Sequence, residues 1–489
     1  MFNRIKNKWN NVPLTVKVSA SYAICSILQK CLSFITLPLF TKLLTKEQYG
    51  QYTVYASWSV ILSIFITLNL AYGSFSTAMT KYEDNRDQYI STIQCITVAL
   101  AAIFLCIYLP FHRLWNKLFQ LPTGLVVLMV FEIIFSNSIL LWSGKKRFEF
   151  KYKSVLAVSI ASSITGPVFA YFLVINTEEK GIARIIGYVS VTILVGIFFF
   201  IYNTFKSKVL FKKEFAKYAL GFNLPLIVYY LSQVVFNQSD RIMIDHISGR
   251  ADAATYGIAY NFSMVLSFVL GSINNSYVPW FYKKIKEGNQ RENRTVSCGI
   301  AVFFGTLLLG IIWFGPEIIK IMAGEQYLAA VYVIPPVTMS LLLLFYSQLF
   351  INVEFYYEQK KSLVGASIAA ALANIVLNYL FITEYGYIAA GYTTLVSYIL
   401  FAACNYLAMR KILKNRKMPD DAYNYPALIG ILGMFIFLSI AGVLLYNYFI
   451  IRISIAMVLV LFLFIKRKSV FKLIKIIRSK ETISDSKKS

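Results

Sequence analysis

Long apolar runs constrain this chain more than any other feature of its sequence. Segments of about 20 apolar residues recur from one end to the other, and a helix of that length crosses a hydrocarbon layer of ~30 Å. Only 15% of the 489 residues are charged, whereas ordinary soluble domains are about a quarter charged. The sequence therefore predicts an all-α polytopic membrane protein with no room for a soluble domain between the spans.

Fourteen such runs can be placed along the chain. They cover residues 14–40, 51–72, 88–109, 121–142, 154–175, 181–201, 218–247, 255–278, 296–314, 328–351, 362–382, 388–409, 425–445 and 448–465. The last run is the weakest, because Arg452 interrupts it. The N-terminal segment lacks the short apolar core and the cleavage site of a removable signal, so the first run is expected to remain in the membrane.

The distribution of lysine and arginine predicts the orientation. With the N-terminus placed inside, the predicted cytoplasmic segments hold 36 of the 48 basic residues and the outer segments hold 10. This is the excess described by the positive-inside rule, so both termini are expected to be cytoplasmic. The net charge of +25 then reflects topology and attraction to anionic membrane lipid. We therefore expect no nucleic-acid partner.

The cysteines and histidines offer little for a metal or redox site. All six cysteines lie inside or beside apolar runs without a Cys-x-x-Cys pair, and the only histidines are His112 and His246. Neither a disulfide framework nor a metal site is expected from this pattern.

The two halves of the chain echo one another. The sequence TKEQYGQYTVYASWSVILSIF follows the first run and GRADAATYGIAYNFSMVLSFV follows the seventh. Offsets of 207, 208 and 205 residues separate, respectively, Tyr49-Gly50 from Tyr256-Gly257, Lys153 from Lys361, and Gly181 from Gly386. Six spans per copy make the repeat parallel, an arrangement of transporters whose site lies at the repeat interface. We expect a six-helix lobe at 1–217, a second at 218–415, and two additional helices with a basic tail at 416–489.

Polar side chains follow one face of the first helix in each predicted lobe. In the first run these are Ser19, Ser26, Gln29, Lys30 and Ser33, at spacings that share one helical face. Lys30 lies too deep to reach the inner surface along its own stem. It therefore needs water, a carboxylate or an anionic ligand.

The seventh run carries a similar stripe, made of Asn223, Tyr230, Gln233, Asn237 and Arg241, with Asp240 beside it and Asp245 one turn beyond Arg241. An ionisable group in hydrocarbon costs roughly 3 kcal/mol or more, so it normally faces a protein-lined cavity. Two interpretations stay open. The charges pair with neighbouring helices and hold the lobes together, or both stripes line one central cavity that binds the substrate.

Three further polar residues are candidates within apolar runs. Glu132 in the fourth run is either an ion-coupling carboxylate or a counter-ion for Lys30. Asn374 and Asn378 lie one helical turn apart, where they either bind sugar or form interhelical hydrogen bonds.

Two stretches carry a family resemblance. LPLFTKLLTKEQYGQY and QSDRIMIDHISGRADAATYGIAYNFSMV resemble the Wzx-type family of bacterial oligosaccharide flippases, in the superfamily that also holds the MATE multidrug exporters and the lipid II flippase. The similarity extends over nearly the whole chain in span count, lobe repeat and orientation. Its motifs distinguish the superfamily from other transporters better than they distinguish its branches.

The resemblance implies a protein of the bacterial cytoplasmic membrane that moves an undecaprenyl-diphosphate-linked oligosaccharide to the outer leaflet by alternating access. The product is then an O-antigen, a capsule or another surface polymer, and the partners include polysaccharide polymerase and chain-length machinery. Cavity cations are expected to receive the diphosphate and sugar, and Lys30 and Arg241 occupy matching helices. A proton or sodium gradient is the expected driving force, and no bound cofactor is expected.

Two alternatives belong to other functional classes. A MATE-like exporter of small cationic molecules would want carboxylates in the cavity of the first lobe, where the first run offers Lys30 and no acid. A membrane glycosyltransferase, ligase or polymerase usually needs a sizeable outer loop, but the longest predicted here has only about 16 residues. The sequence therefore favours a flippase over an enzyme.

Overall fold

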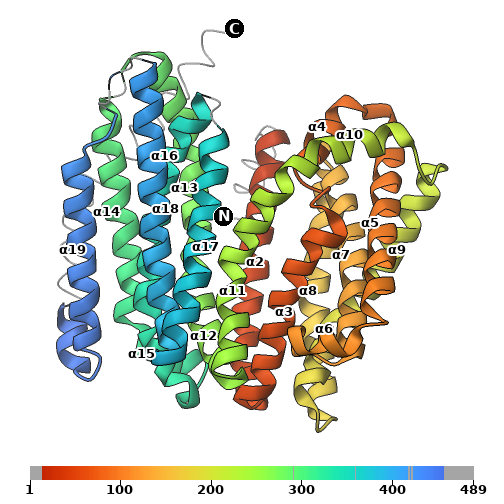
Figure 1. Cartoon of the computed structure of the whole chain (residues 1–489), viewed down its shortest axis with the longest axis horizontal. Coiled ribbons are helices and arrows are strands. Elements are labelled where there is room, and N and C mark those ends of the chain that lie inside the picture. The colour runs from red at the N-terminus through yellow and green to blue at the C-terminus, as the bar shows by residue number, and fades with distance from the viewer. Residues whose placement is uncertain (1–13, 290, 358–359, 417–418, 420–421, 456–489) are drawn as a thin grey trace, which may run out of the picture. The chain divides into compact units, whose positions relative to one another are not determined.

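The computed structural model describes residues 14–289, 291–357, 360–416, 419 and 422–455. Every regular element in that part of the chain is a helix (Figure 1). Contacts divide the chain into two compact units, Met1–Ala254 and Thr255–Ser489.

The first unit is built from seven long helices and several short ones. The long helices are α2 (Leu14–Leu43), α3 (Lys46–Thr67), α5 (Arg86–Tyr108), α7 (Thr123–Phe148), α8 (Tyr152–Ile175), α9 (Lys180–Ser207) and α11 (Ile227–Ile247). Between them lie α4 (Ser74–Lys81), η1 (Glu83–Asn85), α6 (His112–Phe119), α10 (Lys213–Asn223) and η2 (Leu224–Leu226). The boundary between the units falls within α12 (Arg250–Ser263).

The second unit continues with helices of similar length. They are α13 (Ser267–Lys286), α14 (Glu292–Trp313), α16 (Ile334–Tyr356), α17 (Lys360–Tyr385), α18 (Tyr387–Asn415) and α19 (Tyr425–Leu444). Short elements connect them: η3 (Met264–Leu266), α15 (Gly315–Met322) and η4 (Glu325–Tyr332).

The helices account for most of the predicted spans. Eleven helical segments of the described residues are long and apolar enough to cross a membrane, by length and composition. Helices α2 and α3 overlap the first two predicted runs, with α3 placed five residues earlier than predicted, but neither is among those eleven. The fourteenth predicted run extends past Ile455 and so lies mostly outside the described residues. The all-α multi-pass membrane fold is confirmed, while the count of fourteen stays a prediction.

The motif that follows the first run begins helix α3 with a capping box. The Thr45 hydroxyl accepts a hydrogen bond from the Gln48 N–H at 3.3 Å, and the Gln48 side-chain oxygen accepts one from the Thr45 N–H at 3.1 Å. Both bonds satisfy backbone donors that the first helical turn would otherwise leave without partners. The TKEQ sequence therefore fixes the start of α3 at Lys46, three residues before Tyr49-Gly50.

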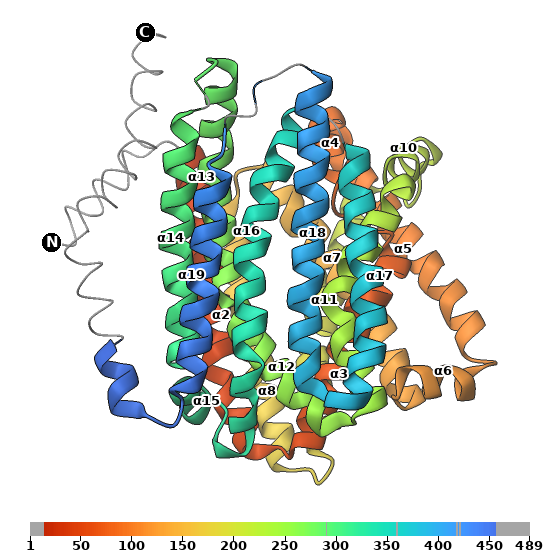
Figure 2. The same cartoon turned by 60° about the vertical axis from the view of Figure 1, so that its left-hand side comes forward.

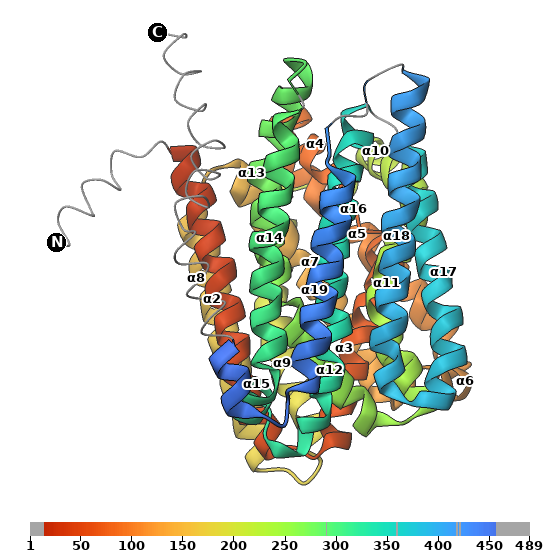
Figure 3. The same cartoon turned by 90° about the vertical axis from the view of Figure 1, so that its left-hand side faces the viewer.

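One apolar cluster joins four helices of the first unit. Most of its buried members come from α3, α5, α7 and α9, with α7 contributing a run that includes Val126, Met129, Val130 and Ile133, and Phe119 and Leu121 at the end of α6 complete it. Helix α8 packs on α9 and also on α2, beside which it lies in Figure 3. The core of this unit therefore surrounds α7.

In the second unit, α16 takes the central place, because 83% of its most apolar stretch is buried. It packs against α14 and α18, while α17 packs on α18 and α19 on α14 (Figure 2). In the first unit α7 packs against α5 and α9, and α8 packs against α9. The same pattern recurs in the second unit, with α14, α16, α17 and α18 in the places of α5, α7, α8 and α9. This correspondence agrees with an internal repeat, and the lobe boundaries at 217 and 415 stay a prediction.

Candidate functional site

The predicted polar stripe of the seventh run begins at Asn223, the last residue of α10, and this residue has a structural role. Asn223 is fully buried at the joint between α10 and η2. Its side-chain oxygen accepts a hydrogen bond from the Ser74 N–H at 3.4 Å, and its amide group donates one to the Asn69 carbonyl at 3.3 Å. Asn223 therefore ties the end of α10, just before α11, to the segment between α3 and α4.

The charges further along α11 are buried within the first unit. Asp240 is 1% exposed and Arg241 is 8% exposed, on a helix that packs against α3. The Arg241 guanidinium donates a hydrogen bond to the Gln238 side chain at 2.6 Å. One turn earlier, the Asn237 amide group donates to the Gln233 carbonyl at 2.7 Å. The structure thus places Gln233, Asn237 and Arg241 along α11, and their role in substrate binding stays a prediction.

The end of α11 is joined to two other parts of the unit. The buried carboxylate of Asp245 forms an ion pair with Arg250 at 3.8 Å, and the same guanidinium donates a hydrogen bond to the Gln120 carbonyl. Gly50 of α3 lies so close that an added Cβ would be 2.1 Å from the Arg250 carbonyl oxygen. Arg250 therefore connects α11 with α3 and with the turn after α6.

The stripe on the first helix is only partly described. Gln29 is half-buried, and its amide group lies 3.5 Å from the Ser159 carbonyl of α8, at the limit of a hydrogen bond. Lys30 belongs to α2, but its side chain lies outside the described residues. Its assignment to a cavity therefore stays a prediction.

Glu132 of α7 faces hydroxyl groups of α3. The Tyr55 hydroxyl donates a hydrogen bond to Glu132 Oε2 at 2.8 Å, and the Ser59 hydroxyl lies 3.5 Å from the same oxygen. Among the described residues, no cation forms an ion pair with Glu132. A carboxylate that is held by neutral donors can take up a proton or a small cation, as the ion-coupling hypothesis requires.

The two asparagines of α17 connect it to α18. The Asn378 amide group donates to Asn374 Oδ1 at 3.2 Å, and the Asn374 amide group lies 3.5 Å from the Thr394 hydroxyl. The Thr393 hydroxyl donates to Asn378 Oδ1. Both asparagines are fully buried, so the interhelical interpretation describes their contacts in the second unit. Sugar binding by this pair stays a prediction.

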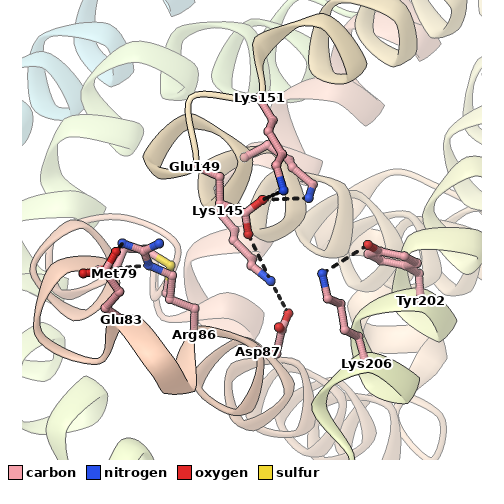
Figure 4. A network of polar contacts seen from close by, with 10 residues as sticks. Met79, Glu83, Arg86, Asp87, Lys145, Glu149, Lys151, Tyr202 and Lys206 are labelled. Carbon is pink, nitrogen blue, oxygen red and sulfur yellow. Dashed lines mark hydrogen bonds and ion pairs between the residues drawn. The ribbon is translucent and has the colours of Figure 1, made fainter. Parts of the chain in front are cut away.

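The structure also shows a charged network that the sequence analysis did not single out (Figure 4). Lys145 of α7 pairs with Asp87 of α5 at 2.5 Å and with Glu149 at 3.3 Å. Lys146 and Lys151 pair with the same Glu149 carboxylate at 2.8 and 3.4 Å. Partial burial opposes ionisation of Glu149, but the hydrogen bond from Lys146 and the positive charges of Lys145 and Lys146 outweigh it and lower its pKa to about 2.

The signal for this network was visible as the run GKKRFEFKYK. The positive-inside rule accounts for its five basic residues as a cytoplasmic segment, and no role was predicted for Glu149. A single acid among five basic residues is the feature that pointed to a local structure. Elsewhere, the described residues contain no group of three histidine, cysteine, aspartate or glutamate side chains that could hold a metal ion.

The fold is that of a multi-pass helical membrane protein with charged side chains buried in a helix of spanning length. The family model described as polysaccharide biosynthesis protein matches residues 16–284, more than half of the sequence, and the chain belongs to this family. The resemblance noted in the two sequence stretches is thereby confirmed.

Two relatives come from Haemophilus influenzae. A protein of its Lsg locus is 23% identical over 386 residues, which cover 76% of this chain and 92% of the relative. An uncharacterized membrane protein is 22% identical over 284 residues, covering 56% of this chain and 67% of the relative.

Solved structures of a lipid II flippase and of MOP-superfamily transporters share the fold. The lipid II flippase MurJ in an inward closed conformation aligns with a TM-score of 0.65 at 16% identity, covering 94% of this chain and 99% of MurJ. An inward-facing multidrug MATE transporter aligns with a TM-score of 0.52 at 14% identity, covering 83% and 96%. A transporter of the superfamily from Pyrococcus furiosus reaches 0.53 at 13% identity, covering 83% and 96%. At these identities the likeness concerns the fold.

Proposed function

We propose that this protein is a flippase that moves a lipid-linked oligosaccharide, carried on undecaprenyl diphosphate, across the bacterial cytoplasmic membrane. The oligosaccharide is a repeat unit of a surface polysaccharide such as an O-antigen or a capsule. Both termini lie in the cytoplasm, and transport proceeds by alternating access of the two lobes. A downstream polysaccharide polymerase with its chain-length machinery receives the cargo.

The observation that carries this proposal is membership of the polysaccharide biosynthesis family across residues 16–284. The match includes α11, which buries Asp240, Arg241 and Asp245 in a helix that is apolar enough to span the membrane. Buried charges in a spanning helix are costly, and they usually mark a pathway for a polar or charged cargo. A diphosphate with attached sugars is such a cargo.

The decisive experiment identifies the lipid that accumulates when the gene is deleted. We expect lipid-linked repeat units to build up on the inner leaflet and surface polysaccharide to be lost. Arg241→Ala should reproduce both effects, whereas Arg113→Ala, which removes an exposed arginine on α6, should leave the polymer unchanged. Normal surface polymer in a well-expressed Arg241→Ala strain would remove Arg241 from the substrate site.

A second candidate function is the cation-coupled export of small molecules, favoured by the shared fold with a multidrug MATE transporter and by Glu132 in the first unit. The same deletion strain separates the two. An exporter predicts hypersensitivity to cationic drugs with normal surface polysaccharide, which is the reverse of what a flippase predicts.

A further inference from the structure

Three lysines at one end of α7 converge on a single carboxylate. We propose that Lys145, Lys146 and Lys151 form an entry site for the diphosphate of the lipid-linked cargo, and that the Glu149 carboxylate occupies this site while cargo is absent. The proposal rests on the flippase function and adds a binding step at residues distant in sequence from Lys30 and Arg241. The basic-residue distribution predicts that this end of α7 is cytoplasmic, where the cargo is made.

The geometry around Glu149 is that of an occupied anion site. Its two oxygens lie 3.3 Å, 2.8 Å and 3.4 Å from the ammonium groups of Lys145, Lys146 and Lys151, respectively. Figure 4 shows Lys145 and Lys151 pointing toward the Glu149 carboxylate, from α7 and from the turn that follows it. Three ammonium donors around one acceptor group match the several oxygens of a diphosphate better than the two of a carboxylate.

The charge balance of the cluster favours a stronger anion. Lys145 has a second carboxylate, Asp87 at 2.5 Å, whereas Lys146 and Lys151 pair only with Glu149 among the described residues. Three cations against two carboxylates leave a net charge of +1. The side chains of Lys145 and Lys146 are only 7% and 10% exposed, so water screens the excess charge weakly. A diphosphate, which carries more negative charge than a carboxylate, can therefore displace Glu149.

The turn after α7 holds the carboxylate in place and leaves the site open at one side. Phe150 has φ +55°, in the left-handed region that a bulky residue rarely adopts. Two backbone hydrogen bonds support it, from the Phe150 N–H to the Arg147 carbonyl and from the Lys151 N–H to the Lys146 carbonyl. This bend brings Lys151 back toward the helix end, while its side chain stays 66% exposed. The cargo can thus reach the cluster past Lys151.

The test measures binding of farnesyl diphosphate, a soluble isoprenyl diphosphate, to the full-length protein in phosphatidylcholine nanodiscs. Glu149→Gln removes the internal competitor but keeps the side-chain shape, so binding should tighten by about tenfold or more. Lys151→Gln should weaken binding by a similar factor without changing thermal stability, because that side chain is exposed. Glu83→Gln is the matched control, since Glu83 pairs with Arg86 at 3.2 Å and is 72% exposed.

A purely structural network predicts the opposite result for Glu149→Gln. Binding that stays equal or weakens in folded Glu149→Gln protein overturns the proposal, as does unchanged binding in Lys151→Gln. Equal competition by phosphatidylglycerol nanodiscs would identify a general anionic-lipid surface and also overturn it. Inorganic pyrophosphate should compete, because it shares the diphosphate. Failure here leaves the deletion experiment of the flippase proposal unaffected, so the two can fail independently.

Discussion

The close approach of Gly50 to Arg250 makes a quantitative prediction about packing in the first unit. A Cβ at position 50 would lie 2.1 Å from the Arg250 carbonyl oxygen and 2.8 Å from its carbonyl carbon. Ordinary contact begins at 3.4 Å, so α3 and the first residue of α12 must separate by about 1.3 Å to accept a methyl group. Both contacting atoms are backbone, so no side chain can move aside. Overpacking of this kind typically costs about 1–3 kcal/mol.

The assay is thermal unfolding of purified Gly50→Ala. A unit of about 250 residues shifts its midpoint by roughly 2–4 °C for each kcal/mol, so we expect a fall of about 2–12 °C. Gly124→Ala is the matched control, because Gly124 lies in the first turn of α7 and an added Cβ there meets nothing within 4 Å. That variant should be neutral or slightly stabilised, since alanine favours the helix. A Gly50→Ala midpoint equal to that of Gly124→Ala would refute the close packing.

Three further predictions concern ionisable groups. The pKa of Glu149 is lowered from 4.5 to about 2, so its ion pairs stabilise the fold above pH 4.5, and this stabilisation is lost as the pH falls toward 2. Thermal unfolding midpoints measured across this range should therefore fall more in the wild type than in Glu149→Gln. Arg452, 1% exposed, pairs with Glu317 in the second unit, and Arg452→Gln should cost about 3 kcal/mol in thermal unfolding, partly restored when Glu317→Gln is added. If Glu132 couples ions, Glu132→Gln should alter the dependence of transport on pH or sodium, and an unaltered dependence would mark it as structural.

The fold was predictable from the sequence because the membrane leaves few choices. Apolar runs of spanning length must form helices that satisfy their own backbone groups, and this settled the helices of both units. The short helices α4 and α6 were not predicted, since each is shorter than a span, and the separation of α10 from α11 within the seventh predicted run was not predicted either. Their positions depend on packing, for example on Asn223 at the end of α10, whose partners are 149 and 154 residues away in sequence.

The candidate site was predictable in its residue types but not in its partners. Buried charge in α11 was expected from the cost of an ionisable group in hydrocarbon. The pairing of Asp245 with Arg250, and of Arg250 with the Gln120 carbonyl, depends on how the ends of α11 and α6 meet. The Glu149 network was missed for a different reason. The positive-inside rule accounts for the lysines near the end of α7 by membrane orientation alone. It therefore did not indicate that they bind Glu149.

Arg250 also explains why two ways of dividing the chain disagree. The predicted internal repeat assigns α11 to the second lobe, whereas its contacts place it in the first unit, which ends at Ala254. The backbone of Arg250 packs against Gly50 and its side chain binds Gln120 and Asp245, so the end of α11 is attached to α3 and α6. The proposed alternating access then requires either that these contacts break in every cycle or that α11 moves together with α3 and α6, which it contacts. The Gly50 contact makes the second arrangement the less costly one, because a backbone packed at that distance cannot slide past α3 without first moving away from it.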